Sequence, residues 1–130
     1  MIYLDTIYIA IQNIKRYNKD NKIRQGGKTV NTQFKKGALE LCVLSQLTKG
    51  DQYGYELTEA ISREIELSTG TLYLILKRLK DEEQVETYSM EVPGRPARKY
   101  YHLTQKGLEY QQQLRQEWKE FTQAVDRLID

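Results

Sequence analysis

The chain has 130 residues, with 20 Lys and Arg against 18 Asp and Glu, so its formal net charge is only +2. This length suits one domain and is short for a core that also encloses an active site. Because the charges nearly balance, the place of the basic residues matters more than their number. The single cysteine, Cys42, excludes an intrachain disulfide and a cysteine zinc site. We therefore expect a binding domain whose folding depends on packing.

The amino-terminal extension, residues 1–33, differs in character from the rest of the chain. Apolar residues at positions 4, 7, 11 and 14 predict one stripe on a short helix, and a basic, polar stretch follows. The apolar part is too short to span a bilayer, which takes about 20 residues, and its charges are on the wrong side for a signal peptide. Two interpretations remain open. The extension is either a helical or disordered arm or a translated leader, with Gln25-Gly26-Gly27 encoded by a ribosome-binding sequence and Val30 as the start.

Three helices are predicted between Phe34 and Gln84. The first ends at Gly50, Asp51 caps the second, and Ser68 or Thr69 caps the third. A short link between the second and third helices predicts a helix-turn-helix. The residues expected to face inward are Ala38, Leu41, Leu44, Leu47, Leu57, Ala60, Ile61, Ile65, Leu72, Ile75, Leu76 and Leu79.

The third helix has a polar outer face. If its apolar residues are buried, Thr69, Gly70, Tyr73 and Lys77 lie together on the opposite side. Short hydroxyls and a glycine let a backbone approach DNA closely, and helix amino termini attract phosphate. The alternative for this helix alone is a capped start with a solvated face.

After Gln84 the apolar period changes to two, which predicts strands on both sides of a Pro/Gly tip. A hairpin in this place makes the helix-turn-helix winged. Arg95, Arg98 and Lys99 lie within five residues of each other, without an acidic neighbour from Val92 to Tyr100. Beside a helix-turn-helix, such a cluster favours binding to double-stranded DNA.

The last segment predicts a long helix with a heptad seam. A seam of this kind requires a partner helix, so we expect a homodimer. Its apolar positions are Leu114, Trp118, Phe121, Val125 and Leu128.

Several ordered motifs resemble the PadR family of bacterial transcriptional regulators over roughly residues 34–130. Their number and spacing make the resemblance specific in a way that no single motif would be. The motifs are Gly37-Ala38-Leu39-Glu40, Tyr53-Gly54-Tyr55-Glu56-Leu57, Thr69-Gly70-Thr71-Leu72-Tyr73 with Lys77-Arg78-Leu79, Arg98-Lys99-Tyr100-Tyr101-His102-Leu103-Thr104, and Lys106-Gly107.

This resemblance implies a mainly α fold with a small β-hairpin. A winged helix-turn-helix would cover residues 34–103 and a carboxy-terminal dimerisation helix residues 104–130. It also implies a cytoplasmic, dimeric regulator, in most members a repressor that an effector releases. The alternatives are a sequence-independent architectural DNA binder and a protein-interaction module on the same fold.

The resemblance also implies roles for single residues. DNA reading falls to Thr69, Gly70, Thr71, Tyr73 and Lys77, and wing contacts to Arg95, Arg98 and Lys99. Phosphate contacts are expected from Tyr53 and Tyr55 at the start of the second helix. For Arg78 we expect a structural role, with Asp81, Glu82 or Glu83 as its partner. The family commonly ends the third helix with a glycine, which this chain replaces by Glu83-Gln84, so a less sharp turn is expected.

Trp118 admits two interpretations, both of which require a dimer. It resembles the tryptophan on which planar apolar or aromatic effectors stack in some small family members. Otherwise it is the largest side chain of the dimer seam.

The sequence offers no catalytic set. His102 is a lone histidine on a strand, and Cys42 is expected in the core rather than as a redox sensor. We expect no enzyme activity, no cofactor, no metal and no membrane segment.

Overall fold

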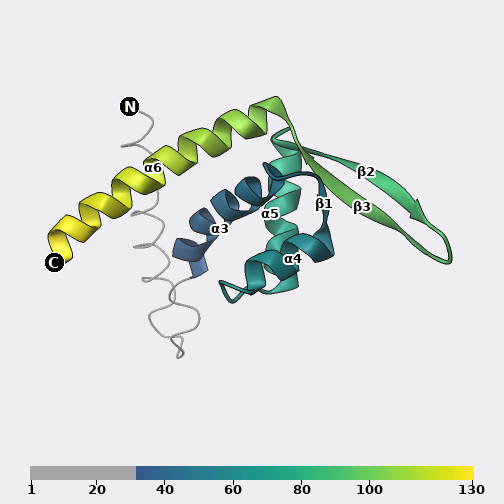
Figure 1. Cartoon of the computed structure of the whole chain (residues 1–130), viewed down its shortest axis with the longest axis horizontal. Coiled ribbons are helices and arrows are strands. Elements are labelled where there is room, and N and C mark those ends of the chain that lie inside the picture. Colours follow the sequence, from purple (N-terminus) through teal and green to yellow (C-terminus); the bar gives the residue numbers. More distant parts are fainter. Residues whose placement is uncertain (1–31) are drawn as a thin grey trace. The chain divides into compact units, whose positions relative to one another are not determined.

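The structure is a computed structural model that describes residues 32–130, with side chains from residue 37 onward. Its elements are α3 (Thr32–Leu47), β1 (Gln52–Tyr53), α4 (Gly54–Ser62), α5 (Thr69–Asp81), β2 (Val85–Val92), β3 (Arg95–Leu103) and α6 (Gln105–Ile129). The predicted mainly α fold with a winged helix-turn-helix is confirmed (Figure 1). The helix predicted over residues 2–14 and the leader hypothesis lie outside the described residues.

The chain divides into two compact units. Glu40–Gln112, called the winged-helix unit below, contains β1, α4, α5, β2 and β3 together with the adjoining ends of α3 and α6. The described part of the other unit, called the terminal unit, consists of residues 32–39 and Gln113–Asp130. Over residues 32–130, none of the helices is both long enough and apolar enough to cross a membrane.

Helix α5 forms as its sequence predicts. The Ser68 hydroxyl accepts a hydrogen bond from the Thr71 backbone N–H at 3.1 Å, so Ser68 is the cap. The four apolar residues of its inner face are buried, and the helix contacts both α4 and β2. Burial of this stripe, rather than intrinsic propensity, fixes the helix and therefore the direction of its outer face.

Helix α4 does not begin as predicted, because Asp51 is not its cap. Tyr53 occupies the cap position, and its backbone N–H donates to Glu56 Oε1 at 3.2 Å. Asp51 directly precedes the short strand β1, which pairs with β3 through Gln52 opposite Tyr101 and Tyr53 opposite Tyr100. The prediction was wrong because a two-residue strand is too short to show an apolar period.

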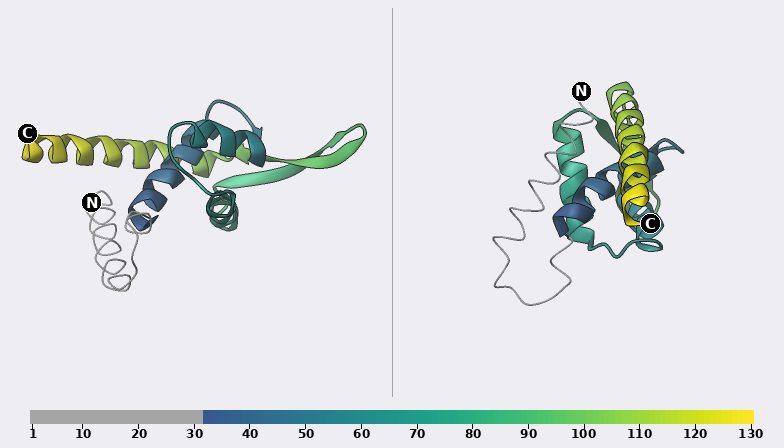
Figure 2. Two further views of the ribbon diagram at one scale, coloured as in Figure 1. Left: turned by 90° about the horizontal axis from the view of Figure 1, so that it is seen from below. Right: turned by 90° about the vertical axis from the view of Figure 1, so that its left-hand side faces the viewer.

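The sheet has three antiparallel strands in the order β1-β3-β2. The predicted hairpin of β2 and β3 is confirmed and extends beyond α4 and α5 (Figure 1). Figure 2 shows its two strands side by side out to the tip. Pro93 and Gly94 form the turn, where the φ of 72° at Gly94 suits glycine.

The turn after α5 is sharper than predicted. Glu83 has a φ of 62°, and the Gln84 N–H donates to the Leu79 carbonyl at 2.9 Å, which closes the helix as a glycine would. The start of α6 packs against this turn: Thr104 Oγ1 donates to the Glu83 carbonyl at 2.8 Å, and a side chain at Gly107 would overlap the Gln84 carbonyl. Tertiary packing therefore holds Glu83 in a conformation that its own side chain disfavours.

Candidate nucleic-acid interface

The outer face of α5 gathers most of the side chains that the sequence assigned to DNA reading. Thr69 and Gly70 are exposed, Tyr73 is 45% exposed, and the Lys77 side chain is 74% exposed. Thr71 is half-buried, and its hydroxyl lies 2.8 Å from the Ser68 hydroxyl. Thr71 therefore belongs to the cap, while the other four are open to solvent.

Tyr73 also joins α5 to α4. A methyl group placed on Gly54 would lie 2.5 Å from the Tyr73 hydroxyl and 3.0 Å from its ring. The absence of a side chain at Gly54 thus lets the ring pack on the start of α4. Tyr73 fixes the spacing of the two helices and still exposes part of its ring.

Lys77 forms an ion pair with Asp81 one helical turn later, at 2.9 Å. Both side chains are more than half exposed, and pairs of this kind contribute little to stability. A phosphate group can therefore take the place of Asp81 at low cost.

Arg78 has the structural role that its position predicted. Its Nε lies 3.4 Å from Glu82 Oε1, and its Nη1 lies 3.0 Å from Glu40 Oε2 on α3. The Glu40 side chain is only 7% exposed, and burial, followed by the nearby Glu40 charge, raises the pKa of Tyr110. The cluster joins α3, α5 and the start of α6, so the Arg78 guanidinium is held by two carboxylates although 51% of the side chain is exposed. Glu40 was missed because it lies 38 positions from Arg78.

The cations of the wing are held differently. Arg95 is exposed beside the turn, the Arg98 guanidinium lies 4.6 Å from the centre of the Tyr53 ring, and Lys99 Nζ lies 5.8 Å from that of Tyr101. In the part of the chain that the structure describes, none of the three forms an ion pair. Cations over aromatic rings keep their charge available to an anion.

A row of four tyrosines connects the start of α4 to the wing. Tyr55 and Tyr53 stack at 6.0 Å, Tyr53 and Tyr100 are tilted at 5.7 Å, and Tyr100 and Tyr88 stack at 5.5 Å between ring centres. Tyr88 and Tyr100 were missed, because only the strand register, which pairs them, brings them together. The row sets the direction of the wing relative to α4 and supports Arg98.

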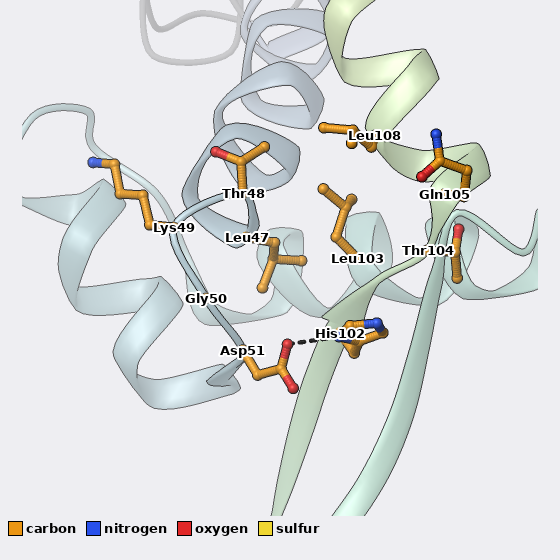
Figure 3. A pocket seen from close by; sticks show the side chains of 10 residues that line it. All are labelled: Leu47, Thr48, Lys49, Gly50, Asp51, His102, Leu103, Thr104, Gln105 and Leu108. Atoms are coloured by element: carbon orange, nitrogen blue, oxygen red, sulfur yellow. Dashed lines mark hydrogen bonds and ion pairs between the residues drawn. The ribbon is translucent and has the colours of Figure 1, made fainter.

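The Asp51 carboxylate holds the base of the wing. It lies 2.7 Å from His102 Nδ1 and accepts a hydrogen bond of 2.8 Å from the Tyr88 hydroxyl. The hydrogen bonds to His102 first and to Tyr88 second lower the pKa of Asp51. Asp51 and His102 line one side of a pocket of about 310 Å³ at the end of α3 (Figure 3). These contacts give His102 a structural partner.

The Cys42 thiol and the possible metal ligands in the described part of the chain show no sign of a chemical role. Cys42 is half-buried, and burial raises the pKa of its thiol, which makes the thiol less reactive. Among the described residues, no three histidine, cysteine or acidic side chains lie close enough together to hold a metal ion.

In the terminal unit, α6 exposes part of the predicted seam. Leu114, Phe121 and Val125 are half-buried, whereas Trp118 is 38% and Leu128 is 85% exposed. An apolar surface of this kind on a single chain is typical of an association site.

Comparison with known proteins agrees with this geometry. The model of the transcriptional regulator PadR-like family matches residues 43–116. A Lysinibacillus sphaericus protein described as uncharacterized protein X is 30% identical over 105 residues, covering 78% of this chain and 96% of that protein. The crystal structure of a PadR-like transcriptional regulator from Bacillus cereus is 34% identical, with a TM-score of 0.69, and covers 76% of this chain and 98% of its own. For a PadR family transcription regulator from Clostridium difficile, the identity is 30%, the TM-score 0.65, and the coverage 70% and 97%. The resemblance drawn from the motifs is thus confirmed, and the chain belongs to the PadR-like family of transcriptional regulators.

Proposed function

We propose that this protein is a homodimeric repressor that binds a pseudo-palindromic operator and is released by an effector. Its family regulates transcription, and the winged-helix unit has the parts needed for duplex DNA. The observation that carries the proposal is the wing: Arg95, Arg98 and Lys99 have no carboxylate partner among the described residues. Phosphates are the natural partners of such cations next to an exposed recognition helix.

In this proposal α5 enters the major groove and the wing lies along the neighbouring backbone. Thr69, Gly70, Tyr73 and Lys77 face the groove from the exposed side of α5. Tyr53 and Tyr55, at the start of α4, contribute phosphate contacts, although the Tyr55 hydroxyl donates to Glu59 at 2.8 Å and must change partner. These contacts position the chain, while the α5 side chains read bases.

The dimer rests on the exposed part of the α6 seam. Two chains joined there with two-fold symmetry would place their α5 helices about 34 Å apart, one turn of DNA. The operator would then consist of two inverted half-sites. The dimer is therefore part of the specificity for DNA.

Release by an effector involves Trp118, whose side chain is 38% exposed. A planar apolar or aromatic molecule can stack on the indole, and it would cause release only if it bound the DNA-free arrangement of the dimer more tightly. Fluorescence from this only tryptophan, titrated with planar aromatic compounds, tests the step. A change that is coupled to loss of operator binding supports it, whereas stacking without loss of DNA binding contradicts it.

Gel-shift titration of the full chain separates the proposal from its rivals. The probes are a duplex selected from a random library and a scrambled duplex of equal length and composition, each at several salt concentrations. Preference for the selected duplex by about a thousandfold supports an operator-specific regulator. Equal binding of both duplexes would favour an architectural role, and no binding would favour a protein-interaction module. Transcription in vitro from a promoter overlapping the selected site then distinguishes repression from activation.

A further inference from the structure

Leu74 is a large apolar side chain on the outer face of α5, where the core cannot cover it. It is 67% exposed, although it lies between the partly packed Tyr73 and the buried Ile75. Of the large apolar residues exposed on the winged-helix unit, it alone is a pure hydrocarbon; the others are Tyr55, Tyr73, Tyr88 and Met90.

The position of Leu74 follows from the helix period. Each residue turns the helix by about 100°, so the buried stripe that includes Leu72 and Leu76 defines an inner face. Leu74 and Gly70, four residues earlier, fall almost opposite that stripe, with Lys77 beside them. A helix that lies in the major groove with its inner face on the core therefore directs Leu74 to the base edges.

The neighbours of Leu74 allow a close approach. Gly70 has no side chain, so the backbone one turn before Leu74 can come near the bases. Lys77 is long enough to reach a phosphate at the edge of the groove. A leucine has no hydrogen-bonding group, and the apolar feature on the major-groove edge of a base pair is the thymine 5-methyl group.

We infer that Leu74 contacts a thymine 5-methyl group in each half-site and so determines part of the sequence preference. This inference rests on the proposed DNA binding and deepens it. It assigns apolar readout to a residue that has no polar group of its own. Hydrogen-bonding readout remains with Thr69 and Tyr73, while Lys77 contacts phosphate.

Replacing thymidine by deoxyuridine removes only the methyl group and keeps base pairing. The probe is the duplex that the full chain selects from a random library, with one thymidine at a time replaced by deoxyuridine. Burial of one methyl group predicts about a fourfold rise in Kd at one position per half-site, and about sixteenfold when both half-sites are changed. A selected duplex in which every replacement leaves Kd unchanged would overturn the inference. Failure to select any duplex would instead count against DNA binding itself.

Variants at Leu74 then identify the residue that makes the contact. The Leu74→Ala variant should bind the thymidine and deoxyuridine duplexes with equal Kd, because its shorter side chain no longer reaches the methyl group. The Leu74→Met variant should keep the fourfold difference in Kd. Lys80→Ala is the matched control, since Lys80 is exposed on the same helix but lies to the side of Leu74. It should keep the fourfold difference. If Leu74→Ala keeps it as well, another residue makes the contact and the inference is wrong. Because Leu74 is exposed, the melting temperature of the variants should match that of the parent and so exclude misfolding.

Discussion

The winged-helix unit and the carboxy-terminal part of α6 differ in what they leave exposed. The winged-helix unit exposes cations, and α6 exposes apolar side chains. The winged-helix unit buries most of its apolar side chains, with Leu44, Leu57, Leu72 and Leu76 fully covered, yet leaves the wing cations without carboxylate partners among the described residues. In α6 the apolar seam remains partly exposed. The apolar stripes of α5 and α6 have a similar sequence period, but the first is buried and the second is partly exposed. The α5 stripe is covered within one chain, whereas in the function proposed above the α6 stripe is covered by a second chain and the wing cations bind DNA.

The largest expected effect comes from breaking the completed stripe. Leu76→Ala should lower the free energy of unfolding by about 2 to 5 kcal/mol, because it leaves a cavity in a fully buried site. Urea unfolding followed by circular dichroism measures this loss. Leu74→Ala, on the same helix but exposed, should change the free energy by less than about 0.5 kcal/mol. Equal effects at the two positions would contradict the assignment of inner and outer faces.

Next in size is removal of the free cations of the wing. Arg95→Ala with Arg98→Ala should weaken operator binding by about a hundredfold and flatten the dependence of log Kd on log salt by about 0.9 for each phosphate that is no longer neutralised. Gel shifts across a salt series measure both quantities. Arg127→Ala, which removes a cation from the last turn of α6, is the control and should change neither. If the dependence of log Kd on log salt is unchanged in the wing variant, the assignment of the wing to the DNA interface is wrong.

A charge within the incomplete stripe should separate the two chains. Leu128→Asp places a carboxylate on an apolar side chain that is 85% exposed in one chain, and should raise the dimer dissociation constant at least tenfold. Sedimentation velocity over a concentration series measures the change. Gln123→Asp, at an exposed position outside the seam, should leave the dimer intact. A Leu128→Asp variant that remains dimeric at all concentrations would contradict the seam.

The turn that connects α5 to β2 offers a gain in stability. Glu83→Gly should raise the free energy of unfolding by about 0.5 to 1 kcal/mol, because the φ of 62° is unfavourable for glutamate and allowed for glycine. Thermal unfolding measures the gain, and Glu83→Ala should show none. A destabilised glycine variant would mean that the glutamate side chain makes a contribution of its own.

The smallest effect concerns acid. The lowered pKa of Asp51 means that its stabilising contribution is complete above its ordinary value of 3.8 and disappears as the pH falls through the lowered value. Because the pair with His102 is exposed, the contribution should stay below about 0.5 kcal/mol. Melting temperatures of the parent and of Asp51→Asn should therefore differ slightly at pH 6, and should converge only as the pH falls below 3.8 and through the lowered pKa. A difference in melting temperature that grows as the pH falls would contradict the lowered pKa of Asp51.

Much of the fold could be predicted because its signals are local. The period of the α5 stripe, the Ser68 cap and the alternation around the Pro93-Gly94 turn each depend on neighbouring residues alone. The strand β1 was missed because two residues carry no period. The partnership of Glu40 with Arg78 was missed because it joins distant helices.

The candidate site was predicted less completely. The polar residues of α5 and the basic residues of the wing were found from their type and spacing. Tyr88 and Tyr100 enter the site through strand register, and Glu83 takes a glycine conformation because α6 packs against it. Leu74 was not named among the site residues because the search there was for polar and basic side chains. The helix period places it opposite the buried stripe, and its 67% exposure agrees with that position.

The central claim is that two chains, joined through α6, present two α5 helices to one operator. Selection of duplexes from a random library by the full chain, with the mass of the resulting complex measured by sedimentation, tests this claim most directly. We expect enriched sequences with two inverted half-sites about ten base pairs apart from centre to centre, and two chains on each duplex. Enrichment of a single, asymmetric site occupied by one chain, or no enrichment at all, would contradict it.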